Sequence, residues 1–309
     1  MSKLLILGSR GLIGSACKRI FSSSHDLLCP TRQELDLLNR EQSRLYFEKH
    51  RPEFVILAAG IVGGIKYNTD FPADFLMKNL SIQMNVFDAA HQAQVKRLFF
   101  FASSCMYPKE CPQPMKEEML YTGHLEKTSM SYAVSKMAGV QMAAAFNQQY
   151  KTNRNVALLP NSVYGPNDNF NPETGHVMSA LIRRFHDAKV ANLPEVTLWG
   201  NGEPKREFIF ADDVARAIDF ILQHPEVPCP INIGVGFDIS IKSLAEMIAQ
   251  IVGFKGQIVW DIKKPLGTMR KFLDNGKILQ MGWKPTVDLE KGIQITYQWF
   301  LQYESISKF

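Results

Sequence analysis

Short apolar runs alternate along the chain with longer segments whose apolar residues recur at helical spacing. The runs LLILGSR (4–10), DLLCPT (26–31), EFVILAAG (53–60), RLFFFASS (97–104) and NVALLP (155–160) are typical of buried strands, and helical patterns fill 12–23, 79–94 and 131–150. Strands and helices that alternate in this way predict right-handed βαβ units. We therefore expect an α/β fold, a Rossmann doubly wound parallel sheet with helices on both faces.

Three glycines separate the first predicted strand from the first predicted helix. Gly8, Gly11 and Gly14 form a G-x-x-G-x-x-G pattern at this junction. Glycines here allow a tight turn and let a pyrophosphate approach the N-terminus of the helix. The loop therefore predicts a dinucleotide cofactor.

The residues after the second predicted strand favour NADP over NAD. A site selective for NAD carries an acid near this point, where it binds the ribose 2′-hydroxyl. The chain has Thr31 and Arg32 there instead, and Arg10 lies inside the glycine loop. Two cations suit the 2′-phosphate of NADP(H). We expect Asp36 and the stretch Leu57, Ala58, Ala59 to line the adenine and ribose.

The pattern changes after residue 164. Residues 165–204 are richer in Asn, Pro and Gly and contain one helical pattern, at 176–188, before strand and helix return at 206–223. Ser243 and Glu246 predict a capping box that opens a further helix. We expect an NADP-binding Rossmann domain over 1–164, to which 207–235 returns. A smaller, discontinuous C-terminal substrate domain is expected over 165–206 and 236–309.

A tyrosine and a lysine four residues apart provide candidate proton chemistry. Tyr132 and Lys136 share one face of the predicted helix over 131–150. A lysine at that distance lowers the pKa of the tyrosine and holds a cofactor ribose while the tyrosine transfers a proton. Ser103, at the end of the strand before this helix, is placed to hydrogen-bond a carbonyl group.

Composition limits the classes of partner. The 309 residues are 46% hydrophobic and 21% charged, with a dispersed net charge of +5, which does not suggest a nucleic-acid surface. No apolar stretch approaches the roughly 20 residues of a membrane span, so we expect a cytoplasmic protein that does not enter a membrane. Five cysteines without C-x-x-C pairs predict reduced thiols and no metal site.

The glycine loop together with Ser103, Tyr132 and Lys136 resembles the extended short-chain dehydrogenase/reductase family. Within that family, the segments SSCMYPKECPQPMKEE, YGPNDNFNPETGHVMSALIRRFHDAK and GTMRKFLD are similar to the GDP-L-fucose synthases, which are 3,5-epimerase-4-reductases of GDP-4-keto-6-deoxymannose. The similarity extends over nearly the whole chain. It implies NADPH as cofactor, a homodimer and a GDP-sugar substrate.

The resemblance also implies roles for individual residues. Cys105 would remove protons beside the 4-keto group and His176 would return them, after which hydride goes to carbon 4 while Tyr132 protonates the oxygen. Leu12, Ile13 and His176 join the cofactor-binding set. Arg184, Trp199, Arg206 and Lys271 match positions that contact the GDP-sugar.

One departure from the family leaves the sugar open. The chain reads LPNSVYGP where the family commonly has Pro-Thr-Asn-Leu-Tyr-Gly-Pro, so Asn161 is shifted and Ser162 takes the usual asparagine position. An alternative is therefore a C4-reductase of another GDP-sugar, such as a GDP-6-deoxy-heptose, without epimerase activity. A NAD-dependent epimerase or dehydratase and a redox-sensing regulator are two further alternatives. A dehydratase would be expected to carry acidic residues near Ser103, and this chain has none there. A redox-sensing regulator should have lost Tyr132 and Lys136, and both are present.

The helical segments 79–94 and 131–150 carry apolar faces that the fold would bring to one surface. Two copies of such a surface form a four-helix contact. We expect a homodimer built in this way.

Overall fold

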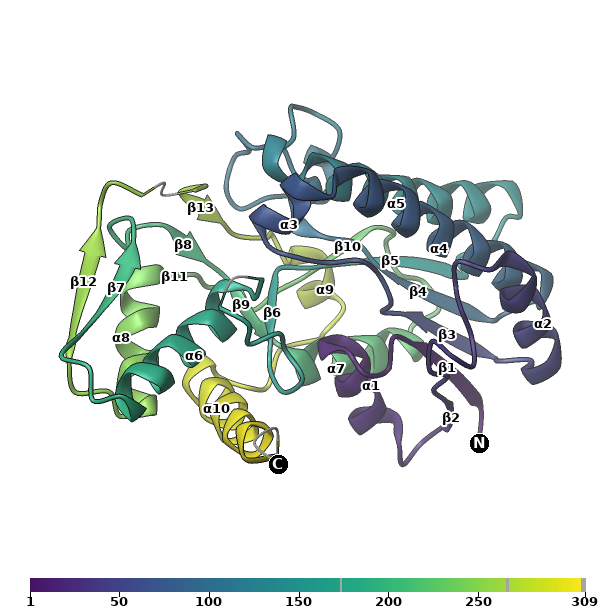
Figure 1. Ribbon diagram of the computed structural model, residues 1–309. Coiled ribbons are helices and arrows are strands. Elements are labelled where there is room, and N and C mark those ends of the chain that lie inside the picture. Colours follow the sequence, from purple (N-terminus) through teal and green to yellow (C-terminus); the bar gives the residue numbers. More distant parts are fainter. Residues whose placement is uncertain (173, 265–266, 307–309) are drawn as a thin grey trace.

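The apolar runs pair into a parallel sheet of six strands in the computed structural model, which describes residues 1–172, 174–264 and 267–306 (Figure 1). The strand order is β10-β5-β4-β3-β1-β2, and every neighbouring pair is parallel. The strands are β1 (Lys3–Leu7), β2 (Asp26–Leu28), β3 (Phe54–Leu57), β4 (Arg97–Phe101), β5 (Asn155–Pro160) and β10 (Ile231–Ile233).

Helices cover both faces of this sheet. One face carries α1 (Leu12–Phe21) and α7 (Ala211–Leu222), and the other carries α2 (Arg40–His50), α4 (Pro72–Gln92) and α5 (Met130–Gln149) (Figure 1). Strand side chains alternate between the two faces. In β1, Leu4 and Ile6 pack in the core with α1 and α7, whereas Leu5 and Leu7 pack in the core with α4 and α5. The predicted doubly wound α/β sheet is confirmed.

The strand order places a crevice beside β1. The chain leaves β1 through α1 to β2 on one side, and then crosses through α2 to β3 on the other side. The connections at the carboxyl ends of β1 and β3 therefore run in opposite directions. In open α/β sheets, ligands bind in the crevice that forms at such a point.

A smaller part is built from strands and helices that follow β5. Its core contains Ile182, Phe185, Leu244, Ile248 and Phe300. The strands β6 (Ser162–Tyr164) and β9 (Phe208–Phe210) pair, as do β7 (Glu195–Trp199) and β12 (Gln257–Asp261), and β8 (Lys205–Arg206) lies between β11 (Ile239–Ser240) and β13 (Arg270–Lys271). The helices are α6 (Val177–Val190), α8 (Ile241–Val252) and α10 (Leu289–Ile306).

Short helical segments complete the described chain. They are α3 (Ile65–Asp70), α9 (Gly276–Gln280), and the 3₁₀ turns η1 (Ser104–Met106), η2 (Glu117–Met119) and η3 (Lys127–Ser129). Within the described residues, no helix has both the length and the apolar character needed to cross a membrane.

Two predicted helix starts are wrong. Helix α4 begins at Pro72 rather than near residue 79, because proline is well suited to the first helical turn. Helix α8 begins at Ile241, and its cap is Ser240 rather than Ser243. The Ser240 hydroxyl accepts a hydrogen bond from the Ser243 amide at 3.0 Å. Ser240 ends β11, so the chain turns into the helix one turn earlier than the capping-box prediction.

A fully buried carboxylate joins the sheet to the smaller part. Oε1 of Glu207 accepts hydrogen bonds from the amides of Val235 (2.7 Å) and Gly236 (3.0 Å) and from Asn275 Nδ2 (3.1 Å). Its Oε2 accepts from Asn161 Nδ2 (3.0 Å) and the Leu273 amide (3.1 Å). Five donors from segments far apart in the sequence thus surround one acid, and hydrogen bonds to the charged form offset its burial.

Replacing this carboxylate should destabilise the fold strongly. In Glu207→Gln, an NH₂ group must face N–H donors, and the charge that the remaining donors need is lost. We expect the free energy of unfolding to fall by about 2–4 kcal/mol, the cost of unpaired buried polar groups. Denaturant unfolding measures this, with Glu195→Gln as the matched control, because Glu195 is an exposed residue of β7. Equal stability of the two variants would remove Glu207 from its proposed structural role.

Candidate active site

The glycine loop connects β1 to α1, and at two of its glycines a side chain would clash with nearby backbone atoms. Gly8 has φ +89°, and a Cβ there would lie 2.7 Å from the Ala59 amide nitrogen. A Cβ at Gly14 would lie 2.1 Å from the Gly8 carbonyl oxygen. At Gly11 the nearest such atom is 3.5 Å away, an ordinary contact. The missing side chain of Gly11 therefore leaves room above the loop, where the first N–H groups of α1 have no side-chain cap.

The two predicted arginines line the same cavity beside this loop. Arg10 and Arg32 line one cavity of about 460 Å³ together with Thr31, Asp36 and Ala59. Glu34 lies nearby, and its carboxylate accepts a hydrogen bond from the Thr31 amide (2.7 Å), which lowers the pKa of Glu34. This acid braces the loop that carries Arg32. The cavity thus offers two exposed cations next to the Rossmann loop, which suits an added phosphate.

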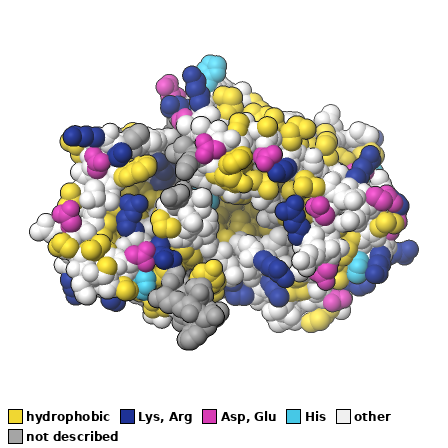
Figure 2. Space-filling view, viewed as in Figure 1, with side chains coloured by type: hydrophobic (Ala, Val, Ile, Leu, Met, Phe, Trp, Pro, Cys, Tyr) yellow, Lys and Arg dark blue, Asp and Glu magenta, His cyan; other side chains and the backbone are white. Residues whose placement is uncertain are grey.

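A second cavity, of about 570 Å³, lies where the sheet meets the smaller part. All five predicted catalytic residues line it: Ser103, Cys105, Tyr132, Lys136 and His176. The predicted cofactor residues Gly11, Leu12, Ile13, Ala58 and Ala59 line it as well. Figure 2 shows a hollow between these two parts of the molecule. Gly11, Ala59 and Gly60 line both this cavity and the arginine cavity, so the two cavities meet at the same loop region.

Two residues of the predicted cofactor set are not in either cavity lining. Leu57 ends β3 and is buried in the core with α4 and α5. Gly14 is buried inside α1, where it allows the close approach to Gly8. Both shape the loop region through packing rather than through exposed atoms.

A 3₁₀ turn presents Ser103 and Cys105 at the end of β4. The Ser103 hydroxyl accepts a hydrogen bond from the Cys105 amide at 3.2 Å, which caps η1. Both side chains are half-buried and face the cavity. The serine therefore ends the strand and fixes the direction in which the cysteine leaves it.

Lys136 is buried and held by the backbone. Its Nζ donates a hydrogen bond to the Phe101 carbonyl oxygen at 2.8 Å and lies 5.0 Å from the centre of the Phe100 ring. Burial lowers the pKa of Lys136 to about 8. The Lys136 ammonium therefore loses its proton more readily than that of a surface lysine.

The electrostatics of Tyr132 differ from the prediction. Burial raises the pKa of Tyr132, the nearby Cys105 thiol raises it further, and a hydrogen bond with Ser103 lowers it. The expected lowering by Lys136 is absent from these contributions. The lysine ammonium points to the Phe101 carbonyl, 5.7 Å from the centre of the Tyr132 ring. Tyr132 is thus kept protonated, as suits a proton donor.

The structure separates the four predicted substrate residues into two pairs. Arg206 on β8 and Lys271 on β13 line the catalytic cavity, and burial lowers the pKa of Arg206. Arg184 donates to the Thr197 carbonyl oxygen on β7 at 3.3 Å, and Trp199 ends that strand with 65% of its surface exposed. Neither residue of this second pair lines the cavity.

Asn161 lies at the catalytic cavity, near the expected sugar site, and protein groups hold it there. Its Nδ2 donates to Glu207 (3.0 Å) and to the Lys271 carbonyl oxygen (3.2 Å), and its Oδ1 accepts from the Ser104 hydroxyl (3.3 Å). The amide is occupied by protein groups. The shifted asparagine therefore braces the catalytic turn, and Ser162, at the usual asparagine position, also lines the cavity, so the identity of the sugar stays open.

Sequence reasoning missed three polar residues, of which Asn79 and Glu207 are buried and Asp168 is half-buried. Asn79 on α4 holds the loop after β3, because it accepts from the Ile61 amide (2.8 Å) and donates to its carbonyl oxygen (3.0 Å). The other two are Glu207 and Asp168, and Asp168 lines the catalytic cavity. A polar residue inside an apolar helical pattern, such as Asn79, was the available signal. Nothing local distinguished the two acids.

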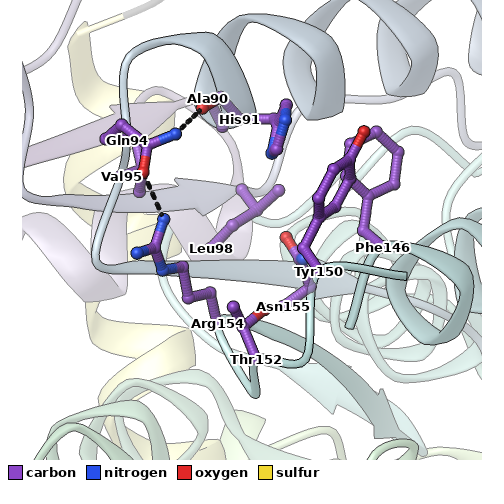
Figure 3. Close-up of a pocket in the computed structure, with 10 residues that line it drawn as sticks. All are labelled: Ala90, His91, Gln94, Val95, Leu98, Phe146, Tyr150, Thr152, Arg154 and Asn155. Carbon is purple, nitrogen blue, oxygen red and sulfur yellow. Dashed lines mark hydrogen bonds between the residues drawn. The ribbon is translucent and has the colours of Figure 1, made fainter. Parts of the chain in front are cut away.

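A hollow at the opposite edge of the sheet is unrelated to these residues. It lies at the amino-terminal ends of β4 and β5, where His91 stacks on Tyr150 (4.1 Å) and Arg154 donates to Gln94 (2.9 Å) (Figure 3). None of the predicted site residues lines it. Parallel α/β sheets bind ligands at their carboxyl edge.

Among the residues that the structure describes, no group of His, Cys, Asp or Glu side chains is arranged to hold a metal ion.

Comparison with known proteins agrees with this arrangement. Residues 4–234 match the NAD dependent epimerase/dehydratase family. A probable GDP-L-fucose synthase 1 of Oryza sativa subsp. japonica is 46% identical, with 97% of this chain and 92% of the relative covered. The GDP-L-fucose synthase of Escherichia coli K12 is 42% identical, with 97% of each chain covered.

Solved structures of similar proteins include two reductases from Campylobacter jejuni. A GDP-6-OMe-4-keto-L-xylo-heptose reductase superposes with a TM-score of 0.90 at 34% identity, with 98% of each chain covered. A GDP-mannoheptose C4 reductase with NADP bound superposes with a TM-score of 0.89 at 36% identity, with 97% of this chain and 98% of the other covered.

Proposed function

The chain belongs to the NAD dependent epimerase/dehydratase family, and from this premise we propose that it is an NADPH-dependent enzyme that epimerises carbons 3 and 5 of a GDP-4-keto-6-deoxy sugar and then reduces carbon 4. The proposed product is GDP-L-fucose. The observation that carries the proposal is one cavity lined by the Ser103, Tyr132 and Lys136 set together with Cys105 and His176. Relatives named GDP-L-fucose synthase support the substrate class.

The epimerisation needs two proton-transfer groups in one cavity. A 4-keto group acidifies the hydrogens on carbons 3 and 5, because the carbanion is delocalised as an enolate. Cys105, at the end of β4, removes the proton as a thiolate. His176, at the N-terminus of α6, returns a proton to the opposite face of the carbon. These two residues reach the cavity from different parts of the molecule, as opposite-face transfer requires.

The reduction uses the residues at the sheet edge. NADPH, when bound over the glycine loop, supplies a hydride to carbon 4. Ser103 orients the carbonyl oxygen, and Tyr132 donates its proton to the oxygen as negative charge develops there. Lys136 holds its position through the Phe101 carbonyl oxygen at 2.8 Å and supports this face of the site.

The smaller part holds the nucleotide sugar in this proposal. Arg206 and Lys271 line the cavity and suit the pyrophosphate, because guanidinium and ammonium groups bind phosphate oxygens. Arg184 and Trp199 lie near β7 and suit the guanosine end. Residues 165–206 and 236–309 then form the substrate domain, and residues 1–164 with 207–235 form the NADP domain.

A reductase without epimerase activity is the second candidate. The similarity to heptose C4 reductases favours it. The joint presence of Cys105 and His176 in the cavity favours the dual activity.

We place the enzyme in the cytoplasm, because its five cysteines are free thiols that suit a reducing compartment. Cell fractionation tests this location.

The preference for NADPH should depend on Arg32. Arg32→Ala is expected to weaken NADPH binding by roughly 1.5–3 kcal/mol, the range of a hydrogen bond to a charged group, and to leave NADH binding nearly unchanged. Fluorescence titration with both cofactors measures this. Arg40→Ala is the matched control, because Arg40 pairs with Asp88 on the protein surface. Equal losses for the two cofactors would contradict a role in binding the 2′-phosphate.

The two half-reactions should separate in two variants. Cys105→Ser should bind NADPH but exchange the carbon-3 and carbon-5 hydrogens with deuterated water very slowly, because a hydroxyl is a far weaker acid than a thiol of pKa about 8.5. Tyr132→Phe should continue the exchange while NADPH oxidation falls by roughly 10²–10⁴-fold, the usual contribution of a positioned acid.

Both variants are run with a GDP-4-keto-6-deoxy sugar in deuterated water. Proton NMR follows the exchange and absorbance follows NADPH. If Cys105→Ser exchanges both hydrogens at the wild-type rate, the cysteine is a packing residue and the second candidate, a simple C4-reductase, replaces the first.

The exposed faces of α4 and α5 support a homodimer. Met77 (62% exposed) and Met84 (53%) lie seven residues apart on α4, and Met130 (42%) and Val134 (41%) lie four apart on α5. Such spacing puts each pair on one side of its helix. Hydrophobic side chains are visible along the upper edge of the molecule, over these helices (Figure 2). Two copies of this surface would form a four-helix contact.

The dimer should dissociate when a charge enters this surface. Met84→Arg is expected to give a monomer at micromolar concentration, because two arginines near a two-fold axis repel and cannot be hydrated. Light scattering measures the mass of both proteins. Ile262→Arg, 77% exposed after β12, is the control for a surface arginine. A wild-type protein that is monomeric under these conditions would overturn the proposal.

A further inference from the structure

Hydroxyl groups on both sides of Cys105 bind to buried asparagines. Ser104, the residue before it, donates a hydrogen bond from its hydroxyl to Asn161 Oδ1 at 3.3 Å. Tyr107, two residues after it, donates from its hydroxyl to Asn232 Oδ1 at 2.7 Å. The proposed mechanism uses neither hydrogen bond. Two such bonds from one short turn to two different asparagines therefore need an explanation.

The two asparagines have the same arrangement of partners. Asn161 directly follows β5, Asn232 lies in the neighbouring strand β10, and both are buried. Asn161 Nδ2 donates to the Lys271 carbonyl oxygen at 3.2 Å, and Asn232 Nδ2 donates to the Asp274 carbonyl oxygen at 3.0 Å. Each amide thus connects the turn that carries Cys105 to the segment 271–274. We call these two connections the amide bridges.

Backbone hydrogen bonds join the same two parts of the chain. The Met115 amide donates to the Phe272 carbonyl oxygen at 2.8 Å, and the Asp274 amide donates to the Met115 carbonyl oxygen at 2.8 Å. Asn232 Nδ2 also donates to the Met115 carbonyl oxygen, at 3.0 Å. The loop that follows β4 and the segment 271–274 are therefore held together both through side chains and through the backbone.

Filling space does not require these polar groups. A phenylalanine occupies nearly the same volume as Tyr107 and needs no partner. Burial raises the pKa of Tyr107, so its hydroxyl keeps the proton that it donates. A buried hydroxyl or amide loses its hydration, and only well-aligned hydrogen bonds offset that loss. Buried polar groups whose partners are all present therefore specify one geometry more sharply than apolar contacts do.

We propose that Asn161 and Asn232 are positioning residues that fix the Cys105 thiol relative to Lys271. The inference rests on the proposed function, in which Lys271 binds the pyrophosphate and Cys105 removes a proton from the sugar. Because the sugar is covalently joined to the pyrophosphate, the carbon that loses its proton lies at a limited reach from Lys271. The thiolate must lie within hydrogen-bonding reach of that proton. The amide bridges set this distance, since they tie the catalytic turn to the segment that carries the lysine.

Each bridge can be broken from the side of the turn. Ser104→Ala removes the hydroxyl that binds Asn161, and Tyr107→Phe removes the hydroxyl that binds Asn232. Both asparagines and their bonds to the segment 271–274 stay in place. The thiol of Cys105 is itself unchanged, so an effect on its chemistry reports its position.

Two matched controls remove a buried hydroxyl elsewhere. Ser43→Ala acts on α2, where the Ser43 hydroxyl donates to the Asn39 carbonyl oxygen at 3.1 Å. Tyr164→Phe acts on β6, where the Tyr164 hydroxyl donates to the Leu289 carbonyl oxygen at 3.4 Å. Neither residue lines the catalytic cavity. The controls therefore measure the effect of a lost buried hydrogen bond on general stability.

The first readout is the alkylation of Cys105 in the free protein, which needs no substrate. The thiol is half-buried, so its reaction with iodoacetamide depends on how often the turn opens. In Ser104→Ala and in Tyr107→Phe the rate should rise by about 2- to 12-fold, the change in open population that one hydrogen bond is worth. Peptide mass spectrometry follows each cysteine separately. Cys29, half-buried after β2, should react at the wild-type rate in every variant.

The second readout is hydrogen exchange on the bound keto-sugar in deuterated water. The exchange rate should fall by roughly 10- to 100-fold in both turn variants, because a displacement of about 1 Å can cost that much. NADPH affinity, measured by fluorescence titration, should stay at the wild-type value because the glycine loop is unchanged. Both control variants should keep the wild-type rates of alkylation and exchange.

Wild-type alkylation of Cys105 in the turn variants would overturn the proposal, and so would an equal rise in the controls. If alkylation rises but exchange keeps its wild-type rate, the bridges only stabilise the fold and the proposal is wrong. Each turn variant tests its own bridge, so one result stands even where the other protein does not fold. If alkylation rises as expected but the wild-type enzyme turns over no GDP-4-keto sugar, the bridges hold the turn and the proposed function fails.

Discussion

Five hydrogen bonds to the buried carboxylate of Glu207 determine how the two parts of the molecule meet. The donors come from the turn after β5, the loop after β10 and the segment after β13. A charge that is fully removed from water is tolerated only where such donors replace the water. The neighbouring residue Arg206 and the strand of Lys271 are therefore fixed beside the cavity. Through Asn161, the same network reaches the Ser104 hydroxyl and hence the turn that carries Cys105.

Two ionisable side chains that line the cavity, Lys136 and Tyr132, are largely removed from water. Lys136 gives up hydration for one carbonyl oxygen and two aromatic faces, and its pKa falls to about 8. Burial raises the pKa of Tyr132, because the charged phenolate is disfavoured away from water. Both shifts disfavour the charged form of the side chain. A phenol that keeps its proton suits the proton-donor role proposed for Tyr132.

Local patterns predicted the parts of this site that local physics controls. The glycine loop follows from steric limits between Gly8, Gly14 and the β3 end, and Tyr132 and Lys136 share a helix face because of helical spacing. Glu207 could not be found in this way, because its partners lie 28 to 68 residues away in sequence. The hydrogen bonds of Asn161 to Glu207 and to the Lys271 carbonyl oxygen could not be predicted for the same reason. Arg184 and Trp199 matched family positions, but whether they reach a ligand depends on how β7 stands relative to the cavity.

The interaction between Cys105 and Tyr132 suggests how one cavity can hold both a base and an acid. The Cys105 charge raises the pKa of Tyr132, so the two groups cannot readily be ionised together. In the proposed mechanism, a Cys105 thiolate would therefore leave the Tyr132 phenol protonated for the later reduction. Ser103 contacts both, through the Cys105 amide and through the Tyr132 hydroxyl. The proposed base and the proposed acid thus lie beside one serine, and ionisation of the first disfavours ionisation of the second.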